Sequence, residues 1–242
     1  LVDRDAQRLE SVARDLGAAN VVTIVADVTK EADCEAYARQ AAAALGPIDV
    51  FFNNAGVEGV TAPTRAYPLD VFEKVMAVNV TGVFLGLKHM IPVMRDGGSI
   101  INVSSAGALR PRPQIAPYAG AKAALNALTE AFAFEYGPKV RVNTISPGRF
   151  LTDVSKAWSE EHKLNATAAL QRSGRPEEIV TAALYLASSR SSFTTGSVRP
   201  RRMAITGLRK AGRNWRASAA RRASDLADAQ CASQRTNSGG YS

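Results

Sequence analysis

Cysteine and histidine are scarce in this chain of 242 residues, which contains two of each. Cys34 and Cys231 lie far apart, and His89 and His162 stand in no spacing that metal sites use. A dense disulfide framework, typical of small secreted domains, is therefore excluded, and we expect no metal site. The expected compartment for such a chain is the reducing cytoplasm.

Long hydrophobic runs are missing as well. No apolar stretch reaches the ~20 residues that cross a bilayer, and the first ten residues are charged rather than signal-like. We therefore expect no membrane partner. Because the chain begins with Leu1 rather than methionine, we expect an N-terminal part to be absent. The length fits a single core, since chains divide into separate cores beyond roughly 250–300 residues.

Acidic residues are almost absent from the end of the chain. Residues 1–198 carry 20 basic and 20 acidic side chains, whereas residues 199–242 carry ten basic and two acidic ones. No lasting helical or strand period runs through 199–242, so the sequence predicts one domain over 1–198 followed by a basic, poorly ordered tail. Such a tail would bind nucleic acid or other anions with a steep salt dependence. Its arginine-rich part contains one aromatic residue, Trp215, so we expect no nucleic-acid partner.

Within the domain, amphipathic stretches alternate with short apolar runs rich in β-branched residues. This pattern is typical of a parallel sheet with crossover helices. The predicted strands are 21–26, 48–52, 99–103 and 140–145, and the predicted helices are 6–16, 30–45, 70–94, 117–136 and 176–188. The sequence therefore predicts an α/β fold with a doubly wound parallel sheet.

Tyr118 and Lys122 stand four residues apart in a predicted helix, so their side chains share a face. A nearby ammonium favours the phenolate and lowers the pKa of a tyrosine from about 10, which makes it a proton-transfer group. Ser105 follows a predicted strand, at the sheet edge where α/β sites are built. Asn79 interrupts a helical stretch, which indicates a local polar task. By themselves, Tyr118 and Lys122 are also compatible with an exposed helical pair, and Asn79 with a buried amide bonded to backbone.

Further motifs accompany these four residues in a fixed order. They are Asn53-Asn54-Ala55-Gly56, Ser146-Pro147-Gly148 with Thr152, and Thr195-Gly196. Together with Ser105, Tyr118, Lys122 and Asn79, they resemble the short-chain dehydrogenase/reductase family over about residues 1–198. The resemblance implies a Rossmann-type sheet and an NAD(P)-dependent oxidoreductase that interconverts a secondary alcohol and a ketone. It also implies a homo-oligomer, a tetramer or a dimer, paired through helices 70–94 and 117–136.

The resemblance also implies a role for each catalytic residue. Tyr118 passes a proton to or from the substrate oxygen, and Lys122 lowers the pKa of Tyr118 and holds the nicotinamide ribose. Ser105 orients the substrate, and Asn79 supports a water-mediated proton path. Positioned proton transfer of this kind contributes roughly 10²–10⁴-fold to a rate. The variable substrate lid would lie at 149–165, and its residues do not name the substrate.

The same resemblance places the cofactor along the chain. The residues expected to contact it are Asp3, Asp27, Val28, Asn53, Ala55, Gly56, Tyr118, Lys122, Pro147, Gly148 and Thr152. Asp3 ends the family's second strand, where a carboxylate accepts hydrogen bonds from the ribose 2′-hydroxyl and repels a 2′-phosphate. This favours NAD, although the neighbouring Arg4 keeps NADP open.

Two departures from the family stand at the ends of the chain. The glycine-rich turn that receives the pyrophosphate is absent, and Leu1-Val2-Asp3 already corresponds to the second strand. The sheet should therefore be incomplete at its first and last strands, with unpaired backbone at a central edge and poor dinucleotide binding. The alternative to an active enzyme is thus an inactive fragment or pseudoenzyme. The residues Arg201–Ala204 after Val198 can be encoded by codons that give Asp-Gly-Trp when the reading frame starts one base later, and this sequence resembles the family's ending. We therefore hypothesise that the tail is translated out of frame.

Overall fold

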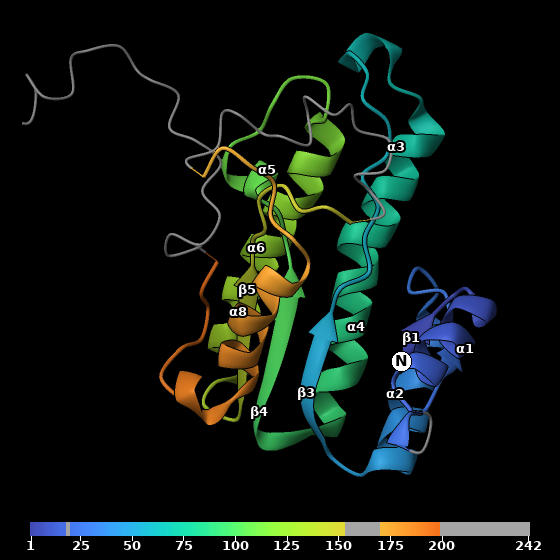
Figure 1. Cartoon of the computed structure of the whole chain (residues 1–242), viewed down its shortest axis with the longest axis vertical. Helices are drawn as coiled ribbons and strands as arrows, with labels where there is room; N and C mark the ends of the chain where they lie inside the picture. Colours follow the sequence, from blue (N-terminus) through green and yellow to red (C-terminus); the bar gives the residue numbers. More distant parts are fainter. Residues whose placement is uncertain (18–19, 153–169, 199–242) are drawn as a thin grey trace, which may run out of the picture.

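The computed structural model describes residues 1–17, 20–152 and 170–198 (Figure 1). It contains two parallel sheets, one of β1 (Val2–Asp3) and β2 (Ile24–Val25), the other of β3 (Ile48–Asn53), β4 (Met94–Val103) and β5 (Val140–Ile145) in the order β3-β4-β5. The predicted α/β fold is confirmed. The predicted tail, 199–242, lies outside the described residues, as does most of the expected lid.

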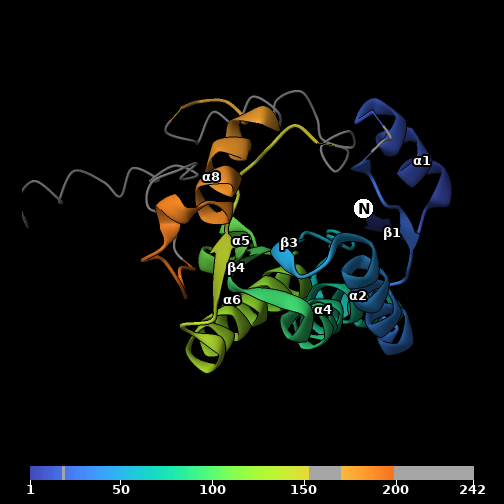
Figure 2. The same cartoon turned by 90° about the horizontal axis from the view of Figure 1, so that it is seen from below.

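Helices flank the strands on both sides. They are α1 (Ala6–Asp15), α2 (Glu31–Leu45), α3 (Leu69–Met76), α4 (Gly82–Met90), α5 (Ala106–Leu109), α6 (Ala116–Tyr136) and α8 (Glu177–Ala187), with a π-helix at Ala77–Thr81 and 3-10 turns at Thr64–Ala66, Ile91–Val93 and Ser189–Ser191. Figure 2 shows α2, α4 and α6 along one face of the strands and α1 and α8 on the other. This two-sided cover is the doubly wound arrangement that the alternating pattern predicts.

Helix ends agree with the sequence better than strand ends do. The helix predicted over 117–136 spans Ala116–Tyr136, and the one predicted over 176–188 spans Glu177–Ala187. By contrast, the strand predicted over 21–26 is paired only at Ile24–Val25. A helix makes its own hydrogen bonds, whereas a strand extends only as far as a partner does. The partner of β2 is β1, which itself begins at Val2.

The core that positions α6 contains a buried polar network. Ile100, Leu125 and Val142 are fully buried between the three-stranded sheet and α6. Beside them, Asn102 Nδ2 on β4 donates to Thr129 Oγ1 on α6 at 2.9 Å, and the Thr144 hydroxyl on β5 donates to the same oxygen at 2.8 Å. These bonds fix the rotation of α6 against both strands. They thereby fix the direction of every side chain at its first turns.

The two sheets separate between β1 and β3. Phe51 packs in the clusters that contain α2 and α4, so the alternation of a strand places Val50 and Phe52 on the opposite face. That face carries α1 and α8, and Figure 2 shows no described helix over β3 between them. Val50 and Phe52 are 39% and 44% exposed. The break and the bare apolar face lie where the sequence predicts a missing strand and helix.

The helical run Leu69–Val93 is long and apolar enough, by length and composition, to cross a membrane. Its inner face, however, is part of the protein core. Val83 and Leu87 pack against β4 and α6, and Asn79 within the same run is fully buried. We therefore interpret this run as a core helix of the α/β fold.

Candidate active site

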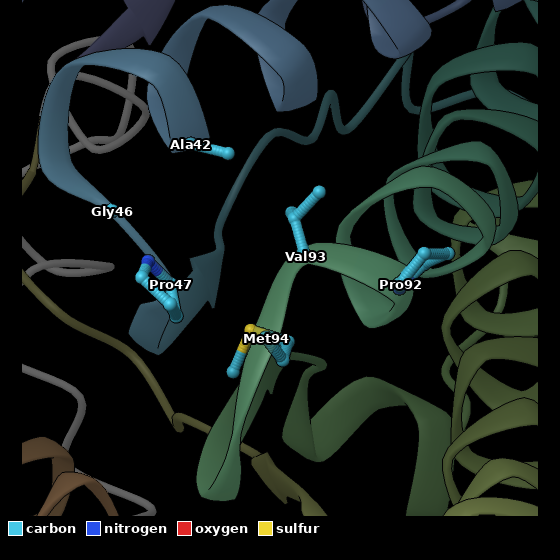
Figure 3. Close-up of a pocket in the computed structure, with 6 residues that line it drawn as sticks. All are labelled: Ala42, Gly46, Pro47, Pro92, Val93 and Met94. Atoms are coloured by element: carbon cyan, nitrogen blue, oxygen red, sulfur yellow. The ribbon is translucent and has the colours of Figure 1, made fainter.

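A surface pocket of about 320 Å³ lies among the amino-terminal ends of the strands (Figure 3). It is lined by Ala42, Gly46, Pro47, Pro92, Val93 and Met94. None of these six side chains titrates or donates a hydrogen bond. The residues expected to be catalytic lie elsewhere, beyond the carboxyl ends of β3, β4 and β5, which is the usual edge for α/β sites.

Ser105 and Tyr118 lie side by side at that edge. Ser105 begins α5, and its Oγ accepts a hydrogen bond from Gly107 N at 3.0 Å. A Cβ atom on Gly107 would lie 3.3 Å from Ser105 Oγ and 3.9 Å from Tyr118 Cε1. The Ser105 hydroxyl also acts as a hydrogen-bonding neighbour that lowers the pKa of Tyr118. A substrate oxygen between them would meet both hydroxyl groups.

Lys122 lies one helical turn beyond Tyr118 and is 3% exposed. Its Nζ donates to Val103 O at 2.8 Å, at the end of β4. Ser104 Oγ donates to Lys122 O at 3.1 Å, which ties the backbone of α6 to the same strand end. Burial lowers the pKa of Lys122 to about 8, because the ammonium has lost most of its water.

Asn79 occupies the middle of the π-helix and is fully buried. Its Nδ2 donates to Val57 O at 2.7 Å and to Val75 O at 2.9 Å, and its Oδ1 accepts from Val57 N at 3.3 Å. The wider π-turn is a feature often found at functional sites. Asn79 thus holds the loop after β3 by both backbone groups of Val57.

Gly56, in the loop after β3, lies next to side chains from the π-helix and from α6. A Cβ atom there would lie 2.9 Å from Asn79 Oδ1 and 3.2 Å from Lys122 Nζ. Only glycine leaves room for both side chains. The loop after β3, the π-helix and α6 therefore bring Gly56, Asn79 and Lys122 together, and Tyr118 lies one helical turn before Lys122.

The sequence-based expectation that Lys122 lowers the pKa of Tyr118 is wrong for this structure. The pKa of Tyr118 is raised, first by burial and also by the carboxylate of Glu58, with Ser105 opposing them. The ammonium of Lys122 is engaged by Val103 O and is itself poorly hydrated. In this state the phenol of Tyr118 is protonated at neutral pH.

Three expected cofactor residues make structural contacts near the carboxyl ends of β2 and β3. Asp27 accepts hydrogen bonds from Thr29 N at 3.0 Å and Thr29 Oγ1 at 2.8 Å, which lower its pKa. Asn53 Nδ2 donates to Val83 O at 3.3 Å, joining β3 to α4. Val28 packs on Gly82, where a Cβ atom would lie 3.0 Å from Val28 Cγ2.

The loop after β5 also reaches the site. Pro147 O accepts a hydrogen bond from Ala106 N at 2.8 Å, next to Ser105. Ala55, Pro147 and Gly148 are half-buried, whereas Thr152 is exposed at the edge of the described residues. Pro147 and Gly148 therefore lie beside the catalytic candidates.

Asp3 is not brought into this group. It ends β1 in the separate two-stranded sheet, is exposed, and its Oδ1 accepts from Asp5 N at 3.0 Å at the start of α1. Within the described ranges, no hydrogen bond or ion pair links its side chain to β3, β4 or β5.

The Thr195-Gly196 motif serves the sheet. Thr195 Oγ1 accepts from Val142 N at 3.1 Å, and Gly196 N donates to Val142 O at 2.8 Å. The segment thereby covers the outer edge of β5.

Sequence reasoning missed Glu58. This carboxylate is half-buried beside Tyr118, two residues beyond the Asn-Asn-Ala-Gly motif. The signal for Glu58 in the sequence is its position, because it is an acidic residue that closely follows the Asn-Asn-Ala-Gly motif at the end of a strand.

Comparison with known proteins agrees with this geometry. A family model described as enoyl-(acyl carrier protein) reductase matches residues 1–200. A short-chain dehydrogenase/reductase from Serratia marcescens superposes with a TM-score of 0.75 at 35% identity, covering 80% of each chain. The chain is a member of the short-chain dehydrogenase/reductase family. It is thus an oxidoreductase with a Rossmann-type α/β fold.

Two proteins named as dehydrogenases are similarly related. NAD+-bound xylitol dehydrogenase superposes with a TM-score of 0.74 at 30% identity, covering 81% of this chain and 85% of that one. Inactive 2-(S)-hydroxypropyl-CoM dehydrogenase 2 of Xanthobacter autotrophicus is 37% identical over 209 residues, or 82% of this chain and 90% of the relative.

Lys122 makes the stability of this short-chain dehydrogenase/reductase depend on pH. The pKa of Lys122 is about 8 in the folded chain and has its ordinary value of 10.5 in the unfolded chain. Between these two pH values, the unfolded chain therefore binds one proton more than the folded chain. The free energy of unfolding should therefore rise with pH across that window, by roughly 3 kcal/mol at most. Urea unfolding at pH 7 and pH 10 measures the rise, and Lys122→Met should remove it. Lys139→Met, at an exposed lysine, should leave it unchanged, and a rise that survives Lys122→Met would contradict the assignment.

Proposed function

We propose that this oxidoreductase interconverts a secondary alcohol and a ketone by hydride transfer to or from a nicotinamide cofactor. The observation that carries the proposal is that Asn79 and Lys122 meet at Gly56, while Tyr118, one helical turn from Lys122, lies beside Ser105. It supplies a hydroxyl pair for the substrate oxygen, a buried ammonium and an amide that holds the adjoining loop. A bound nicotinamide would supply the hydride acceptor or donor.

In the proposed reaction the chain's own residues handle the proton. During alcohol oxidation, the phenol of Tyr118 first loses its own proton along the water path beside Asn79, and the phenolate then takes the proton of the substrate hydroxyl. In ketone reduction, the protonated phenol gives its proton to the substrate oxygen. Ser105 Oγ orients the same substrate oxygen through a hydrogen bond. The ammonium of Lys122, which donates to Val103 O in this structure, would hold the ribose of a bound nicotinamide cofactor. Asn79 keeps the loop fixed and offers a polar group for a water path.

The described residues fit one half of a dinucleotide better than the other. At the expected nicotinamide end, the space at Gly56 beside Lys122 admits no side chain, and Pro147 O accepts a hydrogen bond from Ala106 N next to Ser105. At the expected pyrophosphate end, β1 and β3 belong to separate sheets among the described residues. Asp3 and the NAD+-bound xylitol dehydrogenase support NAD as the cofactor, with NADP as the alternative because of Arg4.

A fluorescence titration with NADH tests the proposed function. Saturable binding in the micromolar range by this exact chain would exclude an inactive fragment, and a change in absorbance at 340 nm when secondary alcohols and NAD are supplied would demonstrate the proposed reaction. The absence of saturable binding would favour the alternative of an inactive fragment or pseudoenzyme. The similarity to an inactive dehydrogenase of Xanthobacter autotrophicus gives that alternative a precedent.

The remaining sequence-based expectations are proposals of the same kind. We propose a single domain over 1–198, with 199–242 as a separate tail that lies outside the described residues.

A homo-oligomer through α4 and α6 is supported by Phe134, which is 90% exposed on α6, and by Phe84, which is 41% exposed on α4. Cys34 is a free, buried thiol, which is compatible with the cytoplasm.

A further inference from the structure

We propose that Glu58 is a specificity-determining residue, whose carboxylate accepts a hydrogen bond from a hydroxyl or ammonium on the substrate carbon next to the reacting carbon. This inference deepens the proposed function and rests on Tyr118 being the proton-transfer group. It would make vicinal diols, hydroxyketones and amino alcohols better ligands than simple alcohols or ketones.

The loop that carries Glu58 is held on both sides of that residue. On one side, the Asn79 side chain binds the N–H and the C=O of Val57. On the other, Tyr67 Oη accepts a hydrogen bond from Val60 N at 3.3 Å. Gly59 between them has a φ of +79°, and a Cβ atom there would lie 2.7 Å from Val75 Cγ2. The backbone of Glu58 therefore has a fixed position.

The far end of the loop is tied to the segment before α6. Ala62 N donates to Gln114 O at 3.1 Å, and α6 begins two residues after Gln114. This bond keeps the Glu58 loop beside the first turn of α6, which contains Tyr118. The proximity is also electrostatic, because the Glu58 carboxylate raises the pKa of the Tyr118 phenol.

Glu58 has no partner for its charge among the residues that the structure describes. It is half-buried, yet no hydrogen bond or ion pair within those residues reaches its carboxylate. Partial removal of water from a carboxylate is costly unless a donor replaces the water. A substrate bound at Tyr118 would occupy the remaining water space, so a donor on the substrate would be favoured there.

The other charged and titratable groups around Tyr118 do not fill this role. Ser105 faces the phenol from the end of β4, and Lys122 stands one turn along α6 with its Nζ bonded to Val103 O. Both Arg112 and Arg149 are basic; burial lowers the pKa of the Arg149 guanidinium, and repulsion from Arg112 adds to this effect. Glu58 is thus the acidic group described beside the reacting centre.

Binding measured on the Tyr118 resonance tests the inference without turnover. The chain is labelled with ¹³Cζ-tyrosine, the Tyr118 signal is assigned with Tyr118→Phe, and cyclohexanol, trans-1,2-cyclohexanediol and trans-2-aminocyclohexanol are titrated. We expect the diol or the amino alcohol to perturb the signal at roughly tenfold lower concentration than cyclohexanol. Glu58→Gln should abolish most of this preference and lower the pKa of Tyr118.

Glu130→Gln, at an exposed position on the same helix, is the matched control and should change neither property. A larger loss with the amino alcohol than with the diol identifies an ammonium as the preferred donor, and the reverse identifies a hydroxyl. A Tyr118 signal that responds equally to all three ligands, or to none, overturns the inference. So does a preference that survives Glu58→Gln. A chain that shows the preference but no alcohol oxidation with NAD keeps the inference and loses the proposed function.

Discussion

Tyr118→Phe should lower kcat for alcohol oxidation by roughly 10²–10⁴-fold, because it removes the oxygen that carries the proton and leaves the ring in place. The KM for the substrate should change much less, since Ser105 still provides a hydrogen bond to the same oxygen. Initial rates at saturating NAD, with protein concentration checked by absorbance, measure the effect. The free energy of unfolding should stay nearly constant because Tyr118 is only half-buried and its hydroxyl is not part of the core.

Tyr136→Phe is the matched control for this variant. Tyr136 lies on the same helix, and its ring stacks on Phe132 with centroids 5.7 Å apart, an arrangement that does not need the hydroxyl. We expect its kcat to equal that of the unchanged chain. A Tyr118→Phe variant that retains more than a tenth of the activity would show that another group moves the proton.

An added strand, glycine-rich turn and helix ahead of Leu1 should strengthen NADH binding by at least about 100-fold. The strand would pair with β1 and β3, which now belong to separate sheets, and the helix would cover Val50 and Phe52. The turn would add backbone N–H groups for the pyrophosphate, and charge-assisted hydrogen bonds contribute roughly 1.5–3 kcal/mol each. NADH fluorescence titration measures the affinity, and urea unfolding measures the accompanying stabilisation.

The control for this extension replaces the turn glycines with valine and keeps the strand and the helix. It should retain most of the gain in unfolding free energy but little of the gain in affinity, because side chains would block the approach of the pyrophosphate to the backbone. Equal affinities for the two extended chains would contradict the role given to the turn. No stabilisation by either chain would contradict the interpretation of the break between β1 and β3.

The catalytic candidates were predictable because their spacing is local. Tyr118 and Lys122 share a helix face through a four-residue interval that needs no tertiary information, and Ser105 follows an apolar strand that the sequence marks by itself. The start of the helix that contains Tyr118 and Lys122 was predicted to within one residue. The identity of the family followed from the order of these short motifs along the chain.

The protonation states of the site were not predictable in the same way. The spacing of Tyr118 and Lys122 predicts an acidic phenol, but the pKa of the tyrosine is raised and that of the lysine is lowered to about 8. Both shifts have burial as their first cause, and burial depends on segments distant in sequence. Glu58 escaped attention for the same reason, since its neighbour Tyr118 stands 60 positions along the chain.

The sequence by itself determined the α/β class, the extent of the helices, and which residues are the candidates for proton transfer. These depend on periodicity, on hydrogen bonds within one segment and on short motifs. Only the tertiary structure decided that the side chains of Asn79 and Lys122 lie next to Gly56. It also decided that β1 and β3 belong to separate sheets, so that Asp3 on β1 lies away from the catalytic candidates. Those outcomes depend on which strands find a partner and on how much water the packed side chains exclude.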